Sequence, residues 1–227
     1  MLRPVAGLGV VSAVLIAITT TLGIVGAWST WNAYFLAERF LDDDPTVGVP
    51  DLLAADDLVA SITWTRLAVL VVTGVVFVIW LYRARLNSET LCEAPHQRSR
   101  GWVVGSWICP IVNLWFPYQV VSDVWKASNP DTRRQLETLA TERMGSLRFV
   151  SGSAQLGLWW ACWAASFVID RVAAKVIYDE ADPTKEMFRA VAIAETLVTV
   201  LIAVSGVLII MAMRQITRWQ SPPREVS

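Results

Sequence analysis

Residues 196–213, TLVTVLIAVSGVLIIMAM, form a stretch without a single charged side chain. A helix needs about 20 mostly apolar residues to cross the hydrocarbon core of a bilayer. The whole chain has the same bias, since 55% of its 227 residues are hydrophobic and 17% are charged, with a mean hydropathy of +0.48. Soluble domains average about 45–50% apolar and about 25% charged residues. The sequence therefore predicts an all-α integral membrane helical bundle.

Four apolar stretches predict four transmembrane helices, all within a single membrane domain that covers residues 1–227. They are expected at about residues 5–28, 62–82, 149–169 and 190–213. The first stretch is longer than the apolar region of a cleaved signal peptide, which spans about 7–15 residues, so we expect it to be retained. A further stretch, 101–122, is long enough to cross but contains Pro110, Asn113 and Pro117.

The distribution of Lys and Arg predicts which stretches cross. These residues accumulate in cytoplasmic loops, whereas acidic residues contribute little to orientation. If residues 101–122 do not cross, one side of the membrane holds 13 Lys and Arg and the other holds 6. If they do cross, the two sides hold 9 and 10. We therefore expect four spans, with both termini in the cytoplasm.

Residues 101–128 predict a helical hairpin that is broken by proline. A proline inside a helix removes a hydrogen bond and clashes with the preceding turn, so Pro110 and Pro117 separate two short helices. The simplest interpretation is a re-entrant hairpin from the cytoplasm; an interfacial pair of helices and a kinked fifth span are the alternatives. Lipid offers no donors to the carbonyls that the prolines free, so we expect the tip around Asn113 to pack against spans two and four.

Residues 131–147 predict an amphipathic helix that starts near Pro130. Its apolar side chains recur at helical spacing, opposite several charged ones. They are Leu136, Leu139, Ala140, Met144 and Leu147. We expect this helix on the inner leaflet or under the bundle, where anionic lipid attracts nearby Lys and Arg.

A family resemblance is carried by four runs: Arg98-Ser-Arg-Gly-Trp102, Gly105-Ser-Trp107, Pro110-Ile-Val-Asn113-Leu-Trp-Phe-Pro117-Tyr118-Gln119 and Val124-Trp125-Lys-Ala-Ser128. They resemble an actinobacterial multi-pass membrane family known as domain of unknown function 4328. The similarity extends over about residues 60–215, and Arg100 stands where the family pattern has proline. The resemblance implies a protein of a bacterial cytoplasmic membrane, and it implies no activity, substrate or catalytic residue.

The chain contains 12 tryptophans, and their positions along the predicted spans are informative. Five fall at span ends, as expected for the aromatic belt at a membrane–water interface. They are Trp28, Trp31 and Trp64 at outer ends and Trp80 and Trp219 at inner ends. Trp159 and Trp163 instead fall near the middle of span four and on one helical face. They predict either a packed aromatic layer or an aromatic-lined pocket for an apolar or cationic ligand.

Three polar side chains are further candidates. Asn113 either caps the broken helix ends or lines a path for a solute, and Tyr118 follows Pro117 within the most specific motif. Glu195 lies near the outer end of its span, where it either has a function or reaches the headgroup zone. The one histidine, His96, is expected to be solvated or in contact with phospholipid.

These patterns predict a non-enzymatic integral membrane protein that acts through protein or lipid partners, or as a homo-oligomer. One His and three scattered Cys favour neither a metal site nor a cofactor. A net charge of -1 argues against nucleic acid binding. The alternatives are a small-solute channel or transporter with its site at the broken helix, and a membrane enzyme. A transporter predicts polar groups that converge on a cavity, whereas a scaffold predicts a closed interior.

Overall fold

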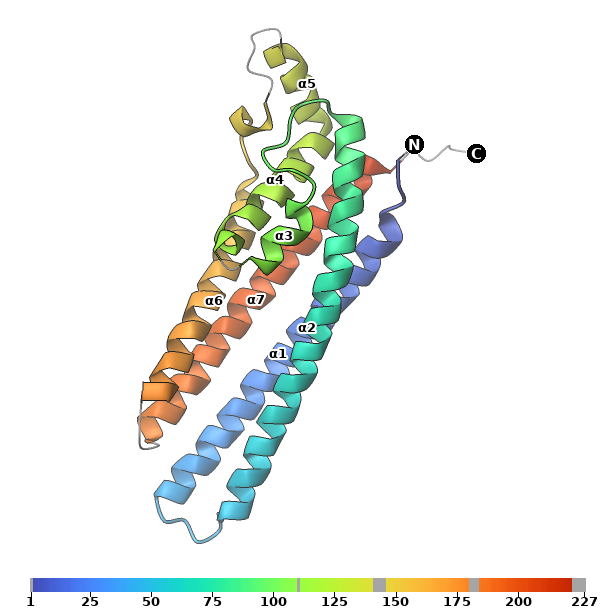
Figure 1. The fold of residues 1–227 in the computed structure, drawn as a ribbon. Helices are drawn as coiled ribbons and strands as arrows, with labels where there is room; N and C mark the ends of the chain where they lie inside the picture. The colour runs from blue at the N-terminus through green and yellow to red at the C-terminus, as the bar shows by residue number, and fades with distance from the viewer. Residues whose placement is uncertain (1, 110, 141–145, 180–183, 222–227) are drawn as a thin grey trace. The chain divides into compact units, whose positions relative to one another are not determined.

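The computed structural model describes residues 2–109, 111–140, 146–179 and 184–221, and every regular element in these ranges is helical (Figure 1). The elements are α1 (Ala6–Leu41), α2 (Val49–Leu91), α3 (Trp102–Ile108), η1 (Val112–Leu114), α4 (Phe116–Ser128), α5 (Pro130–Ala140), η2 (Leu147–Phe149), α6 (Ala154–Asp179) and α7 (Lys185–Gln220). The predicted all-α class is confirmed.

Three of the described helices, α1, α2 and α7, are long and apolar enough to cross a membrane. α2 and α7 contain the predicted spans 62–82 and 190–213, and α1 contains all of the predicted span 5–28 except its first residue. The predicted span 149–169 begins too early, because α6 starts at Ala154. The preceding Ser-Gly-Ser triplet, residues 151–153, favours turns over helix, since serine side chains compete for the backbone and glycine loses much entropy in a helix.

The four long helices each contribute residues to two compact units. Unit 1 comprises residues 1–14, 73–160 and 207–227, and unit 2 comprises residues 15–72 and 161–206.

Helix α4 supplies much of the core of unit 1. Val120, Val121, Val124 and Ala127 have no exposed surface at all. The amide of Asn87 on α2 donates to the backbone of Arg3 and to the side chain of Gln220, which holds both chain ends against α2.

Residues 101–128 contain two short helices, but Pro117 does not separate them. Helix α3 ends at Ile108, and the backbone turns through Cys109 and η1 before α4 begins. Pro117 lies in the first turn of α4, where a helix needs no N–H donor. The expected loss of a helical hydrogen bond at Pro117 is therefore wrong. Pro110 lies outside the described residues.

The amphipathic helix starts where the sequence predicts it, at Pro130, and is described as far as Ala140. Residues 141–145 lie outside the described residues, and Leu147 belongs to η2. Leu136 and Leu147 are both buried, together with Ala127 of α4. The apolar face is therefore covered by protein at Leu136, and not by the leaflet.

In unit 2, side chains link helices that lie far apart in the sequence. The Trp31 indole donates to the Thr196 hydroxyl at 2.9 Å, and Thr199 donates to the Gly23 carbonyl. The Thr184 hydroxyl accepts from the Met187 amide and so caps α7. The bonds of Trp31 and Thr199 hold α7 against α1 within unit 2.

Candidate functional site

An ion pair joins α2 and α7 inside unit 2. Arg66 Nη1 lies 2.7 Å from Glu195 Oε1, and each side chain retains about a quarter of its exposure, 23% and 25%. Glu195 was a candidate from sequence, and the structure gives it a cationic partner that the sequence did not reveal. Two charges in a helical membrane segment are costly unless they are paired or face a polar cavity.

The pair borders a cavity of about 320 Å³ that all four long helices line within unit 2. Besides Arg66 and Glu195, its lining includes the hydroxyls of Thr30 and Thr63 and the carboxylate of Asp170. Asp170 is exposed and forms no ion pair with any described residue. The cavity therefore has one cation and two anions on its wall. Its volume falls within the roughly 300–1,000 Å³ usual for small-molecule sites.

An apolar groove of about 280 Å³ adjoins this cavity on α6 and α7. The two hollows share a wall of three small or medium side chains, Ala173, Val191 and Ala194. The groove continues over Val168 and Val172, whose side chains are exposed. A polar cavity and an apolar groove with a common wall together offer an amphipathic binding surface.

Two highly exposed tryptophans lie beside the cavity in the sequence. Trp28 is 62% exposed and follows the cavity residue Gly26 by two positions; Trp64 is 70% exposed and precedes Arg66 by two. Both lie inside α1 and α2, at the outer ends of the predicted spans 5–28 and 62–82, where indoles suit the headgroup zone of a bilayer. Trp80, which was predicted for the same kind of belt, is instead fully buried in unit 1.

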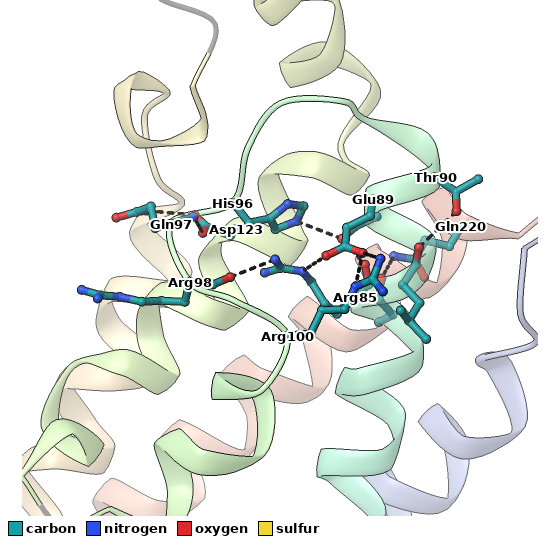
Figure 2. A network of polar contacts seen from close by, with 12 residues as sticks. Arg85, Glu89, Thr90, His96, Gln97, Arg98, Arg100, Asp123 and Gln220 are labelled. Carbon is teal, nitrogen blue, oxygen red and sulfur yellow. Dashed lines mark hydrogen bonds and ion pairs between the residues drawn. The ribbon is translucent and has the colours of Figure 1, made fainter.

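Unit 1 contains a second polar group of residues, which closes on itself (Figure 2). Asp123 of α4 has no exposed surface, and its carboxylate accepts from the backbone and the side chain of Gln97 at 2.7 and 2.9 Å. Glu89 of α2 binds both Arg85 and Arg100. Arg85 also donates to the Arg98 carbonyl. The segment between α2 and α3 is thereby held against α2 and α4.

His96 belongs to this closed network. It is half-buried, and its Nε2 lies 3.1 Å from the Ser88 hydroxyl. Burial, and then the neighbouring Arg85 charge, lower the pKa of His96 to about 4. The expectation of a solvated histidine is therefore wrong. Burial also raises the pKa of Asp123 and lowers that of Lys126, which donates to the Leu147 carbonyl.

The candidates around the broken hairpin lie in unit 1. Asn113 is half-buried in η1, and its Oδ1 is buried without a hydrogen-bond partner. Pro117 is buried, and the Tyr118 hydroxyl lies so close to Gly152 that an added Cβ there would be 3.3 Å from it. The carbonyls of Cys109 and Val112 accept from the backbone amides of Asn113 and Trp115. The Leu114 carbonyl accepts from the Trp160 indole of α6 at 3.0 Å.

The two tryptophan candidates differ in their surroundings. Trp159 is 3% exposed and lies in unit 1, where its ring contacts that of Trp160. Trp163 belongs to unit 2, is half-buried, and stacks on Phe167 with ring centroids 6.0 Å apart. Trp159 therefore pairs with Trp160 in unit 1, and Trp163 pairs with Phe167 in unit 2.

Sequence reasoning missed the residues that complete both polar sites. Arg66 was not among the candidates, although a charge inside the predicted span 62–82 is a visible signal. Asp123 stands three residues before Lys126 in an otherwise apolar run, which is a visible sign of buried charge. Gln97 could not be found, because its role depends on how the segment after α2 folds back.

The fold defines a class: a helical protein with three helices suited to crossing a membrane. In the part of the chain that the structure describes, no three His, Cys, Asp or Glu side chains gather as they would around a metal ion. Residues 43–218 match the family described as Domain of unknown function (DUF4328), and the chain belongs to this family. Neither the curated proteins nor the solved structures gave a match.

Proposed function

We propose that this protein is a non-enzymatic integral membrane protein that binds a polar lipid in unit 2. The observation that carries the proposal is the cavity of about 320 Å³ that shares a wall with an apolar groove. A lipid has the same two parts, a charged headgroup and an apolar chain. Trp28 and Trp64 are exposed and close in sequence to cavity residues, which supports a position of the cavity at the depth of the lipid headgroups.

The cavity lining supports binding more than chemistry. Its three charged groups are an ion pair and a lone carboxylate, with two threonine hydroxyls beside them. Nucleophilic catalysis needs a nucleophile within hydrogen-bond reach of a base that a third group orients. The hydroxyl of Thr30 donates to the carbonyl of Gly26 in its own helix. Polar groups that converge on a cavity also favour ligand binding over a closed scaffold.

The proposed topology has four spans, α1, α2, α6 and α7, with both termini in the cytoplasm of a bacterial cell. Charge supports it: unit 1 carries 13 Lys and Arg against 7 Asp and Glu, and unit 2 carries 6 against 13. Lys and Arg accumulate on the cytoplasmic side, so we place residues 83–100 and 123–148 there. In this topology α3 and α4 form a hairpin that does not cross, and the exposed arginines of unit 1 attract anionic lipid.

Lipid binding is tested by native mass spectrometry of the full chain purified in a mild detergent. We expect a retained lipid in the wild type and its loss in Ala173→Phe, because Ala173 lines both hollows. Val72→Phe is the matched control, since Val72 is 52% exposed in the same unit and lines neither hollow. Equal lipid occupancy in the two variants would contradict the proposal.

Topology is tested by labelling intact cells with an impermeant maleimide, in a background without the three native cysteines. Asp57→Cys in unit 2 should be labelled, whereas Glu93→Cys and Glu137→Cys in unit 1 should not. Glu93 and Glu137 are exposed and lie on opposite sides of the hairpin in the sequence. Labelling of Glu137→Cys alone among these two would establish a fifth crossing.

A further inference from the structure

We propose that the lipid held in unit 2 carries both a primary ammonium group and a phosphate, as an aminophospholipid with an ethanolamine headgroup does. This inference rests on the proposed function. Arg66 receives the phosphate, Asp170 receives the ammonium group, and an acyl chain lies in the groove on α6 and α7.

The charges on the cavity wall call for a cationic group. Arg66 and Glu195 neutralise each other at 2.7 Å, which leaves the carboxylate of Asp170 without an ion pair among the described residues. The cavity is therefore negative by one charge. An ammonium group beside Asp170 gives this carboxylate a cationic partner, and its three N–H donors match carboxylate acceptors.

Arg66 retains donors for a phosphate after it has paired with Glu195. A guanidinium has five N–H donors in a planar fork, and only Nη1 is used by Glu195. The guanidinium also lies against α1, since a Cβ added at Gly23 would be 3.6 Å from Arg66 Cζ. Glu195 and α1 thus fix the fork, and a fixed fork binds phosphate with little further loss of entropy.

Other common headgroups fit this wall less well. A glycerol headgroup leaves the phosphate charge uncompensated, so an anionic lipid adds a negative charge beside Asp170 and Glu195. A choline headgroup has a cation without N–H donors, so it forms no hydrogen bond to Asp170. Charge-assisted hydrogen bonds are roughly twice as strong as neutral ones, which favours ethanolamine.

The groove favours a lipid over a soluble headgroup. Its lining is aliphatic, with Val168, Ile169 and Val172 on α6 opposite Ala190 and Val191 on α7. Burying the methylene groups of an acyl chain against this lining is favourable, because apolar surface is removed from water. Free phosphoethanolamine offers the same polar contacts without this term, so it should compete only weakly with the intact lipid.

The experiment titrates the full chain in detergent with dioleoyl phosphatidylethanolamine, phosphatidylcholine and phosphatidylglycerol, followed by native mass spectrometry. We expect ethanolamine to bind about tenfold more tightly than choline or glycerol lipid, the ratio given by about 1.4 kcal/mol. Asp170→Asn should reduce ethanolamine binding to the level of choline lipid. Asp57→Asn, an exposed carboxylate of the same unit outside the cavity, should change nothing.

The arginine is tested by a pair of variants. Arg66→Gln should weaken ethanolamine and choline lipids alike, because both carry the phosphate, and Arg66→Lys should restore part of the binding. Thermal midpoints identify any variant that fails to fold, and Asp170→Asn then carries the test alone. Equal affinity for the three lipids, with binding still lost in Ala173→Phe, would overturn this inference and leave the proposed function standing. Lipid binding that is insensitive to Ala173→Phe would overturn both.

Discussion

Units 1 and 2 are built from the same four long helices and treat their polar side chains in opposite ways. In unit 1 two charges are enclosed: Arg85 is 3% exposed, Asp123 is fully buried, and both are hydrogen-bonded to the segment after α2. In unit 2 the charges of Arg66, Asp170 and Glu195 border a cavity. Closed polar networks rigidify a fold, whereas polar groups on a cavity wall are available to a ligand. This difference supports a structural role for the closed network of unit 1 and the proposed binding role of unit 2.

The largest expected difference concerns two tryptophans one turn apart on α6. Trp159→Ala should lower the free energy of unfolding by about 3–5 kcal/mol, since a buried indole is removed. Trp163→Ala should cost less than half as much, because Trp163 is only half-buried in unit 2. Thermal or denaturant unfolding in detergent measures both. Equal losses would mean that the two units are packed alike.

A smaller contrast is expected between two arginines of α2. Arg85→Leu should lower the free energy of unfolding by about 3 kcal/mol, which is the low end of the range for a broken buried ion pair. The loss is limited because Glu89 remains paired with Arg100 in the variant. In addition, Arg85 Nη1 forms no hydrogen bond that the substitution would remove. Arg66→Leu should cost at most about 1 kcal/mol, as for partly exposed pairs. The same unfolding measurement applies, and a larger loss at Arg66 would reverse the roles of the units.

As the pH falls, we expect unit 1 to lose stability at a higher pH than unit 2. The pKa of His96 falls from its ordinary 6.5 to about 4 in the fold, so the unfolded chain binds more protons between these values. The stability that His96 contributes is therefore complete above pH 6.5 and is lost as the pH falls towards 4. His96→Gln should flatten this dependence while keeping a hydrogen bond to Ser88.

Two carboxylates serve as references for that pH experiment. Asp44, in the connection between α1 and α2, has its pKa lowered to about 2 by hydrogen bonds from Thr46 and Arg39, so its contribution is lost only below about pH 4. The raised pKa of Asp123 acts in the opposite sense, since its contribution is lost as the pH rises. An unchanged pH profile in His96→Gln would show that His96 is solvated.

The smallest effect is expected at the hairpin tip. The sequence predicts that Asn113→Leu is destabilising, because its amide would satisfy free carbonyls. In the structure, Asn113 Oδ1 is buried without a partner, and the Leu114 carbonyl is served by Trp160. An orphaned acceptor costs free energy, so Asn113→Leu should be neutral or stabilising by up to about 1 kcal/mol. A clear loss on unfolding would restore the sequence-based prediction.

Composition and periodicity predicted the parts of this fold that depend on local sequence. Apolar length gave α1, α2 and α7, and the start of α5 at Pro130 followed from its capping pattern. Features that depend on residues far apart in the sequence were not predicted. The pairing of Arg66 with Glu195 spans 129 positions, and the burial of Trp80 follows from neighbours that a hydropathy profile does not contain. Glu195 was found because a charge inside an apolar run is visible locally.

The most direct test of lipid binding in unit 2 is a solid-state NMR distance between the Arg66 guanidinium carbon and lipid phosphorus. The full chain, labelled with ¹³C at arginine Cζ, is reconstituted in phosphatidylethanolamine bilayers, and Arg66→Lys identifies the signal. A phosphate hydrogen-bonded to the guanidinium predicts a Cζ–P distance of about 4–5 Å. Ala173→Phe should abolish the coupling, and Val72→Phe should retain it. Absence of any coupling at Arg66 in the wild type would contradict the binding of a phospholipid headgroup at this site.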